Sequence, residues 1–203
     1  MLTVYAADIR LFARFENEGM QLLTPLRREK ALKYRKSEDK LLCMCAGLML
    51  RHQLQITSDE DLRYNARGKP ECVSGMHFSI SHSGNYAFLA THAVPIGIDG
   101  ERIRCRKSNV QKRVLTHDEQ QYVGDSDDRF FALWTRKEAV LKALGTGLYL
   151  APHSFSVLHN AVELEGQRFQ FSTQRFMDDY MVSVACVEPL DFKTEFFLPE
   201  YIF

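Results

Sequence analysis

The chain has 203 residues, which is enough for one substantial core or for two small coupled lobes. Its 45% hydrophobic and 26% charged content are those of an ordinary soluble globular protein, and its formal net charge is zero. Nothing global therefore points to nucleic acid or to an anionic membrane, and no apolar run reaches the 18 residues of a membrane-spanning helix.

Local patterns in the first half predict helices and short strands. Thr24 and Pro25 are typical of an N-cap and a first helical residue, so a helix is expected to about residue 34. Ser37 is expected to cap a second, longer helix to about residue 55, and residues 65–70 are expected to form a turn. Strands are expected at residues 2–8, 77–81, 86–91 and 96–99.

The second half shows a similar mixture. Thr116 and Glu119 have the spacing of a capping box, and a helix is expected from about residue 128 to residue 144, ended by Gly145 and kept ended by Gly147. Alternating segments near residues 154–158, 168–172 and 180–187 suit an antiparallel sheet. We therefore predict an α+β fold with mainly antiparallel sheets and packed helices. Two similar lobes, residues 1–100 and 101–203, should share an interface because no linker separates them.

The cysteines form an odd set without metal-binding spacing: Cys43, Cys45, Cys72, Cys105 and Cys186. The N-terminus has no basic region ahead of an apolar stretch, so we expect no secretion signal. Both features favour reduced thiols in a cytoplasmic protein.

Acidic residues occur in two stretches about forty residues apart. Asp99 and Glu101 end a short apolar strand, where alternation puts their side chains on one face, about 6.6 Å apart along the backbone. Glu138 and Lys142 are four residues apart and share one stripe of a helix. If that stripe faces the strand end, three carboxylates and a lysine converge, and such an oxygen-only cluster suits Mg²⁺. The alternative is that Asp99 caps a turn while Glu138 and Lys142 form an exposed ion pair.

Ser81 and His82 close an expected strand, where hydroxyl, backbone amide and imidazole groups could bind phosphate. One alternative is a polar hairpin turn. Another is a hydrolase that uses Asp99, which we disfavour because adjacent strand side chains point to opposite faces and no Gly-x-Ser-x-Gly elbow is present.

A group of cations forms either a polyphosphate site or a solvated face. Arg27 and Lys30 are three residues apart, hence on one face of the first helix, and Lys69 follows in a turn.

Several of these segments resemble the motifs of one enzyme family. Residues 68–70, 78–83, 97–101 and 134–142 occur in the order and approximate spacing of the 4′-phosphopantetheinyl transferases. The resemblance is to the longer single-chain type with two similar lobes related by pseudo-twofold symmetry, and it extends more weakly to residues 24–30 and 154–157. Gly100 departs from the pattern, because the family usually has an apolar side chain there. We expect a local loss of packing or added backbone freedom at that position.

The resemblance implies an activity and a set of site residues. The family transfers the phosphopantetheine arm of coenzyme A to a serine of a carrier protein and releases adenosine 3′,5′-bisphosphate. By this resemblance Asp99, Glu101 and Glu138 hold Mg²⁺ against the pyrophosphate, and Glu138 is also the candidate base for the incoming serine. Lys142 binds the same phosphates and stabilises the leaving group.

The implied contacts with coenzyme A come from several segments of the chain. Ser81 and His82 would contact coenzyme A, His82 near its phosphates. Lys69, Arg27 and Lys30 would lie around the adenine and 3′-phosphate end.

The implied second substrate is an apo acyl or peptidyl carrier protein, which is generally acidic. A basic segment beside the expected metal site could seat it, although its charges could also simply be solvated. The segment contains Arg102, Arg104, Arg106, Lys107, Lys112 and Arg113, with Val110, Val114 and Leu115 nearby. Because two similar lobes are present in one chain, we expect a monomer.

Two other functions would use the same residues. One is a Mg²⁺-dependent coenzyme A or nucleotide pyrophosphatase, with water in place of serine. The other is a non-catalytic module that binds coenzyme A or a carrier. The complete set of Asp99, Glu101, Glu138 and Lys142 argues against the non-catalytic module.

Overall fold

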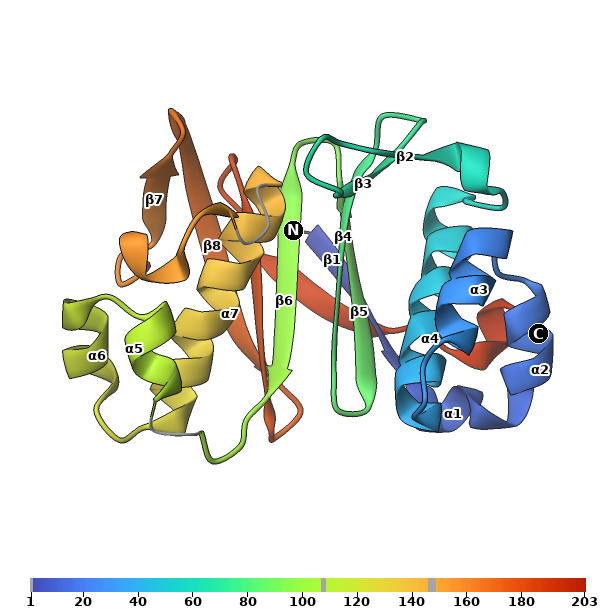
Figure 1. Ribbon diagram of the computed structural model, residues 1–203, viewed down its shortest axis with the longest axis horizontal. Coiled ribbons are helices and arrows are strands. Elements are labelled where there is room, and N and C mark those ends of the chain that lie inside the picture. Colours follow the sequence, from blue (N-terminus) through green and yellow to red (C-terminus); the bar gives the residue numbers. More distant parts are fainter. Residues whose placement is uncertain (1, 107–108, 146–148) are drawn as a thin grey trace.

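The computed structural model describes residues 2–106, 109–145 and 149–203. It confirms the α+β prediction, with two four-stranded sheets in the middle and helices on the two outer sides (Figure 1). The first sheet has the order β10-β1-β5-β4 and the second β6-β9-β8-β7. In both sheets the described strand pairs are antiparallel, except that β1 and β10 are parallel.

The first lobe combines one sheet with a long helix. Its strands are β1 (Leu2–Asp8), β4 (His77–Ser83) and β5 (Tyr86–His92), and a small ribbon is made by β2 (Leu62–Tyr64) and β3 (Pro70–Cys72). Its helices are α1 (Ile9–Phe12), α2 (Glu16–Gln21), α3 (Pro25–Leu32) and α4 (Ser37–Leu54). Short 3₁₀ turns cover Ala13–Phe15 and Asp59–Asp61. Helix α4 is buried on every side from Leu41 to Leu50, which explains why this stretch is almost entirely apolar.

The second lobe repeats this plan. Its strands are β6 (Ile96–Arg102), β7 (Ala161–Leu164), β8 (Gln167–Phe176) and β9 (Tyr180–Cys186). Its helices are α5 (Val110–Val114), α6 (His117–Val123) and α7 (Asp127–Leu144), with a 3₁₀ turn at Pro152–Ser154. Helices α4 and α7 have 18 residues each and cover the outer faces of their sheets, so the two lobes are alike in architecture (Figure 1).

The capping box at Thr116 and Glu119 is confirmed, and Gly145 ends α7 in a left-handed conformation with φ of 75°. Ser37 is wrong as a cap, because Lys36 precedes the helix and Ser37 is its first residue. The expected strand at residues 154–158 is also wrong, since this segment leaves the 3₁₀ turn without joining a sheet. The strand near it is β7, a few residues later. The predicted role of Gly147 lies outside the described residues.

The two sheets face each other across a shared apolar layer. This layer joins residues from both lobes, among them Phe88 of β5, Ile98 of β6 and Val182 of β9. The shared interface predicted from the absence of a linker is therefore confirmed.

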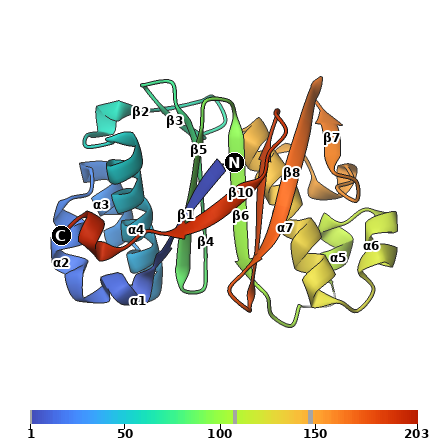
Figure 2. The same cartoon turned by 180° about the vertical axis from the view of Figure 1, so that it is seen from behind.

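The end of the chain returns to the first lobe. Strand β10 (Phe192–Phe196) pairs with β1, and a last 3₁₀ turn (Pro199–Tyr201) brings the C-terminus beside α2 and α3 (Figure 2). Phe197 is fully buried in the core under α4. The last residues thus complete the sheet and the core of the first lobe, although they follow the second lobe in sequence. The two sheets therefore do not divide the chain at residue 100 as predicted, since β6 of the second lobe begins at Ile96 and β10 returns to the first.

Two general features bear on the sequence predictions. Within residues 2–106, 109–145 and 149–203, none of the helices combines the length and the apolar character that crossing a bilayer requires. The five cysteines are free thiols, and Cys105 alone among them is exposed.

Candidate functional site

Strand β6 presents its two acids on the face predicted by alternation. Ile96 and Ile98 are fully buried in the layer between the sheets. Asp99 and Glu101 point the other way, toward serine side chains of β4. A strand with one apolar face and two carboxylates on the other therefore forms one wall of the site.

Helix α7 forms the second wall because it lies unusually close to β6. A Cβ atom at Gly97 would be 1.9 Å from the carbonyl oxygen of Ala139 and 2.5 Å from the amide nitrogen of Ala143. Only glycine permits this contact of backbone with backbone. The close approach brings Glu138 and Lys142 of α7 beside the acids of β6.

Asp99 lies at the centre of the site and is 5% exposed. Its Oδ1 accepts hydrogen bonds from Ser81 Oγ at 2.8 Å and from Lys142 Nζ at 2.7 Å. Its Oδ2 is buried and has no hydrogen-bond partner among the described residues. A buried carboxylate oxygen without a partner is costly, so it indicates a ligand that the folded chain alone does not supply.

The other two acids interact with Asp99 through their charges. Burial raises the pKa of Glu138, and the charges of Asp99 and Glu101 raise it further, while Lys142 opposes the shift. Burial also raises the pKa of Glu101, with Asp99 adding to the effect and the Ser83 hydroxyl opposing it. The structure thus brings the three predicted acids close enough to repel one another.

The acids fit a hard divalent cation by their chemistry. In the part of the chain that the structure describes, no three His, Cys, Asp or Glu side chains already stand in a metal-binding arrangement. The donors are nevertheless all carboxylate oxygens, which Mg²⁺ prefers, and Asp99 Oδ2 is unpartnered. A cation would also relieve the repulsion between the acids, which adds to burial in raising the two glutamate pKa values.

The ammonium groups of Lys142 and Lys69 both donate hydrogen bonds to backbone carbonyl oxygens near the site. Lys142 Nζ donates to Asp99 Oδ1 and also to the carbonyl oxygens of Ile98 at 3.0 Å and Ile80 at 3.3 Å. Lys69 Nζ donates to the carbonyl oxygen of Lys142 at 2.6 Å, at the C-terminal end of α7. Burial lowers the pKa of Lys69. Lys142 therefore contacts the acids directly, whereas Lys69 is held against the backbone at the end of α7.

Two adjoining pockets open beside these lysines. One has a volume of about 290 Å³ and is lined in part by Lys69 and Lys142. The other, of about 180 Å³, is lined in part by Arg27 and Lys30 of α3. The pockets share wall residues, including Phe78. The cations singled out in the sequence thus line two adjoining pockets, where they could contact a polyphosphate ligand.

Ser81 and His82 occupy different environments. Ser81 is buried, and its hydroxyl accepts from the amide of Gly100 while donating to Asp99. His82 is exposed, and partial desolvation and the charge of Lys142 lower the pKa of its imidazole. His82 therefore lies near the cations, whereas the Ser81 hydroxyl is already used within the protein.

The expected loss of packing at Gly100 is not found. A Cβ atom there would be 2.6 Å from Cε2 of Phe88, so the Phe88 ring already fills the space. Phe88 is fully buried in the layer between the sheets. In this chain an aromatic ring of β5 takes the volume that a side chain on β6 would need.

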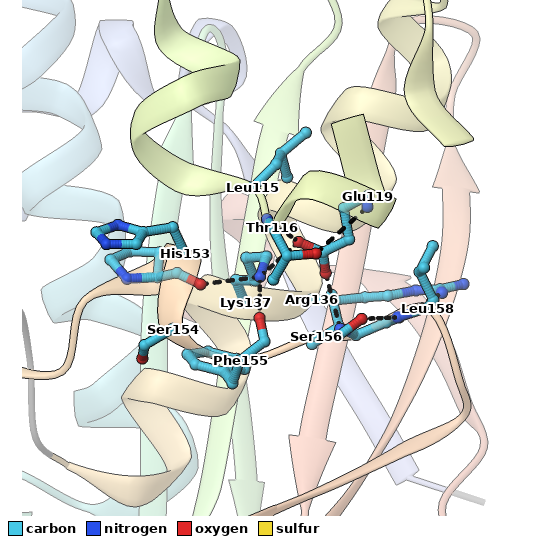
Figure 3. A network of polar contacts seen from close by, with 12 residues as sticks. Leu115, Thr116, Glu119, Arg136, Lys137, His153, Ser154, Phe155, Ser156 and Leu158 are labelled. Atoms are coloured by element: carbon cyan, nitrogen blue, oxygen red, sulfur yellow. Dashed lines mark hydrogen bonds and ion pairs between the residues drawn. The ribbon is translucent and has the colours of Figure 1, made fainter. Parts of the chain in front are cut away.

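The same α7 segment holds a buried ion pair that sequence reasoning missed. Lys137 and Glu119 are both fully buried, with Lys137 Nζ 2.8 Å from Glu119 Oε2 (Figure 3). Lys137 also donates to the carbonyl oxygens of Pro152 and Phe155. Its position within the apolar pattern of α7 was the available signal, because a lysine there must be paired.

Glu119 completes this network and explains the missing strand. Its Oε2 accepts from the amide of Thr116, and its Oε1 accepts from the amide of Val157, each at 2.8 Å. The alternation of Phe155 and Val157 reflects burial beneath α7. Their polar backbone groups bond to Lys137 and Glu119, so the alternation resembled a strand without belonging to one.

The basic segment after β6 is only partly free. Arg106 pairs with Asp127 at 2.6 Å, and Arg102 pairs with Asp179. Val114 and Leu115 are buried, which corrects the prediction that they add apolar surface there. The exposed members are Arg102, Arg104, Val110, Lys112 and Arg113, whereas Lys107 lies outside the described residues.

Comparisons with known proteins show which sequences and structures this chain is similar to. The profile of the 4′-phosphopantetheinyl transferase superfamily matches residues 95–185, which span β6 to β9 and include the three acids. The chain is 30% identical to 4′-phosphopantetheinyl transferase Sfp of Bacillus subtilis (strain 168), over 95% of this chain and 94% of that protein. It is 28% identical to 4′-phosphopantetheinyl transferase ffp of Bacillus subtilis, over 90% of this chain and 89% of that protein. A solved structure of Thermotoga maritima holo-[acyl-carrier-protein] synthase covers 47% of this chain and 63% of its own, with a TM-score of 0.37 and 20% identity.

Proposed function

Because the chain belongs to the 4′-phosphopantetheinyl transferase superfamily, we propose that it moves the phosphopantetheine arm of coenzyme A onto a serine of an apo acyl or peptidyl carrier protein. The second product would be adenosine 3′,5′-bisphosphate. The observation that carries the proposal is the unpartnered, buried Oδ2 of Asp99 beside Lys142, at the edge of a cation-lined hollow.

Asp99, Glu101 and Glu138 would hold Mg²⁺. When bound, the metal would neutralise charge that develops on the pyrophosphate oxygens. What supports this assignment is the oxygen-only donor set and the environment of the acids, because burial and then the charges of neighbouring acids raise the pKa values of Glu101 and Glu138.

Coenzyme A would lie along the two adjoining pockets. Lys142 and His82 would face the pyrophosphate, with Ser81 beside them, because Lys142 contacts Asp99 and its charge acts on His82. Arg27, Lys30 and Lys69 would surround the adenine and 3′-phosphate end, since Arg27 and Lys30 line the second pocket and Lys69 lines the pocket that adjoins it. Phe78, shared by both pockets, offers an apolar surface between these two groups of cations.

In the reaction, the serine hydroxyl of the carrier would form a new O–P bond as the bond from phosphorus to the bisphosphate oxygen breaks. Glu138 would take the proton of the hydroxyl. Lys142 would stabilise the negative charge on the departing bisphosphate.

The carrier would dock beside the metal site, against the exposed cations Arg104, Lys112 and Arg113. Arg106 is a poor target for a test because its guanidinium is already paired with Asp127. We also propose that the protein works in the cytoplasm as a monomer. Its free cysteines support the location, and its two joined lobes support a monomer.

The test is to incubate the protein with coenzyme A, Mg²⁺ and several apo carriers, and to detect the added arm by mass spectrometry. Glu138→Ala and chelation of Mg²⁺ should each abolish transfer. The matched control is Glu163→Ala, an exposed glutamate on β7, which should transfer normally. Release of the bisphosphate without any carrier would contradict the proposal and indicate a hydrolase.

A further inference from the structure

Strands β4 and β6 meet at the seam between the two lobes. They are edge strands of different sheets, yet they run side by side (Figure 1). Serine hydroxyls of β4 accept hydrogen bonds from backbone amides of β6 across this seam. The three bonds, each of 3.1 Å, run from Ile98 to Ser79, from Gly100 to Ser81 and from Arg102 to Ser83.

Each of these hydroxyls still has a proton to donate. Ser83 donates its proton to Glu101 Oε2 at 2.6 Å, as Ser81 does to Asp99 Oδ1. The corresponding β6 position for Ser79 is Gly97, which has no side chain. Ser79 therefore supplies the bond across the seam without a bond to a carboxylate.

The bond between Ser83 and Glu101 is well placed to hold the carboxylate still. Ser83 is 8% exposed, and its oxygen is fixed from the other side by the amide of Arg102. Glu101 has three rotatable side-chain bonds, and the charge of Asp99 repels its carboxylate. A short, charge-assisted hydrogen bond from Ser83 restricts the rotation of the Glu101 side chain and offsets its repulsion by Asp99.

We propose that Ser83 is a positioning residue, whose hydroxyl ties Glu101 to the backbone of β6 and fixes the orientation in which this carboxylate meets a divalent cation. The inference rests on the proposed function, because it takes Glu101 as a metal ligand. Hydrogen bonds that orient a ligand typically change metal affinity by about 10- to 100-fold. Ser81 has the same relation to Asp99, but its proposed contact with coenzyme A makes Ser83 the cleaner test.

The experiment measures Mn²⁺ binding by electron paramagnetic resonance, with coenzyme A present, for the wild type, Ser83→Ala and Ser79→Ala. Each variant loses one bond from a β6 amide across the seam, and Ser83→Ala also loses the bond to Glu101. Both variants should therefore lower the thermal unfolding midpoint, Ser83→Ala by at least as much as Ser79→Ala. Ser83→Ala should also weaken Mn²⁺ binding by about tenfold. Ser79→Ala should leave Mn²⁺ binding unchanged.

A Glu101→Gln background sharpens the test. If Ser83 acts through the Glu101 carboxylate, adding Ser83→Ala to Glu101→Gln should weaken Mn²⁺ binding less than it does in the wild type. The positioning role is overturned if the wild type binds Mn²⁺ and Ser83→Ala binds it equally well. A wild type that neither binds Mn²⁺ nor transfers the arm would overturn the proposed function, and the positioning role with it.

Discussion

Lys137 and Glu138 are neighbours on α7, yet they lie in two opposite kinds of polar environment. Lys137 meets Glu119 in a fully buried pair, and the carbonyl oxygens of Pro152 and Phe155 accept hydrogen bonds from its ammonium group (Figure 3). Glu138 meets two other acids, and burial together with their charges raises its pKa. One residue completes a network, whereas the next adds to a repulsion.

The difference separates structural polar groups from functional ones. In the network around Lys137, both oxygens of Glu119 and the ammonium group have partners. In the acidic cluster, Asp99 Oδ2 has no partner among the described residues, although it is buried. Satisfied buried charges hold a fold in one arrangement, whereas an unsatisfied cluster is tolerated where a ligand completes it.

The largest effect is expected from breaking the buried ion pair of Lys137 and Glu119. Lys137→Met should lower the free energy of unfolding by about 3–5 kcal/mol, because it leaves the charge of Glu119 buried without its partner. Urea denaturation at neutral pH measures this. The matched control is Lys193→Met, which removes an exposed lysine paired with Glu195 and should change stability by less than about 1 kcal/mol.

A second substitution distinguishes lost charge pairing from lost packing. Adding Glu119→Gln to Lys137→Met should restore about 1–2 kcal/mol, since the neutral amide removes the uncompensated charge. Equal stability losses in Lys137→Met and Lys193→Met would show that the buried pair does not hold the fold.

The next effect concerns the acidic cluster and the lysine beside it, and it should appear in the transfer activity. Lys142→Ala should lower kcat/KM for transfer by about 100- to 1,000-fold, because one donor to the developing charge is lost. Lys193→Ala should keep full activity. The measurement is steady-state transfer to an apo carrier, with circular dichroism to show that the variant is folded. Normal turnover of folded Lys142→Ala would remove Lys142 from the proposed site.

The same chemical change should have opposite signs in the two regions. Glu119→Gln should lower the free energy of unfolding by about 2 kcal/mol, because Lys137 loses its counter-charge. Glu138→Gln should raise it by about 1 kcal/mol without Mg²⁺, because it removes a charge that burial and two acids disfavour. Paired denaturation curves test this, and a stability loss in both variants would erase the distinction between the regions.

The acidic cluster was open to prediction because each of its parts has a local signature. The alternation of β6 places Asp99 and Glu101 on one face, and the four-residue spacing places Glu138 and Lys142 on one stripe of α7. The alternation of serines on β4 was visible as well, but its meaning depends on the amides of a strand in the other lobe.

The rest depends on partners that lie far apart in the sequence. Nothing local shows that Lys137 meets Glu119, or that β10 pairs in parallel with β1. The two-residue period at Phe155 and Val157 predicts a strand, yet their backbone groups bond to side chains of α6 and α7. Periodicity reports which side chains are buried, and it cannot report what satisfies the backbone.

The smallest expected effect is a dependence of stability on pH that arises from two acids of the acidic cluster. Glu101 and Glu138 have raised pKa values in the folded state, so between their ordinary pKa of 4.5 and the raised values the folded chain binds more protons than the unfolded chain. Their contribution therefore destabilises the metal-free protein progressively as pH rises through that window, and stays constant above it. Glu138→Gln should reduce this slope, whereas Glu163→Gln should not. Urea denaturation across this pH window, with a chelator present, measures the slope. In a second series with Mg²⁺ and no chelator, the loss of stability at the upper end of the window should be smaller, because Mg²⁺ binds the ionised carboxylates. If the slope is the same in the wild type and in Glu138→Gln, neither burial nor the other acids disfavour the charge of Glu138 in the folded protein. The acidic cluster would then be no more strained than the pair of Lys137 and Glu119.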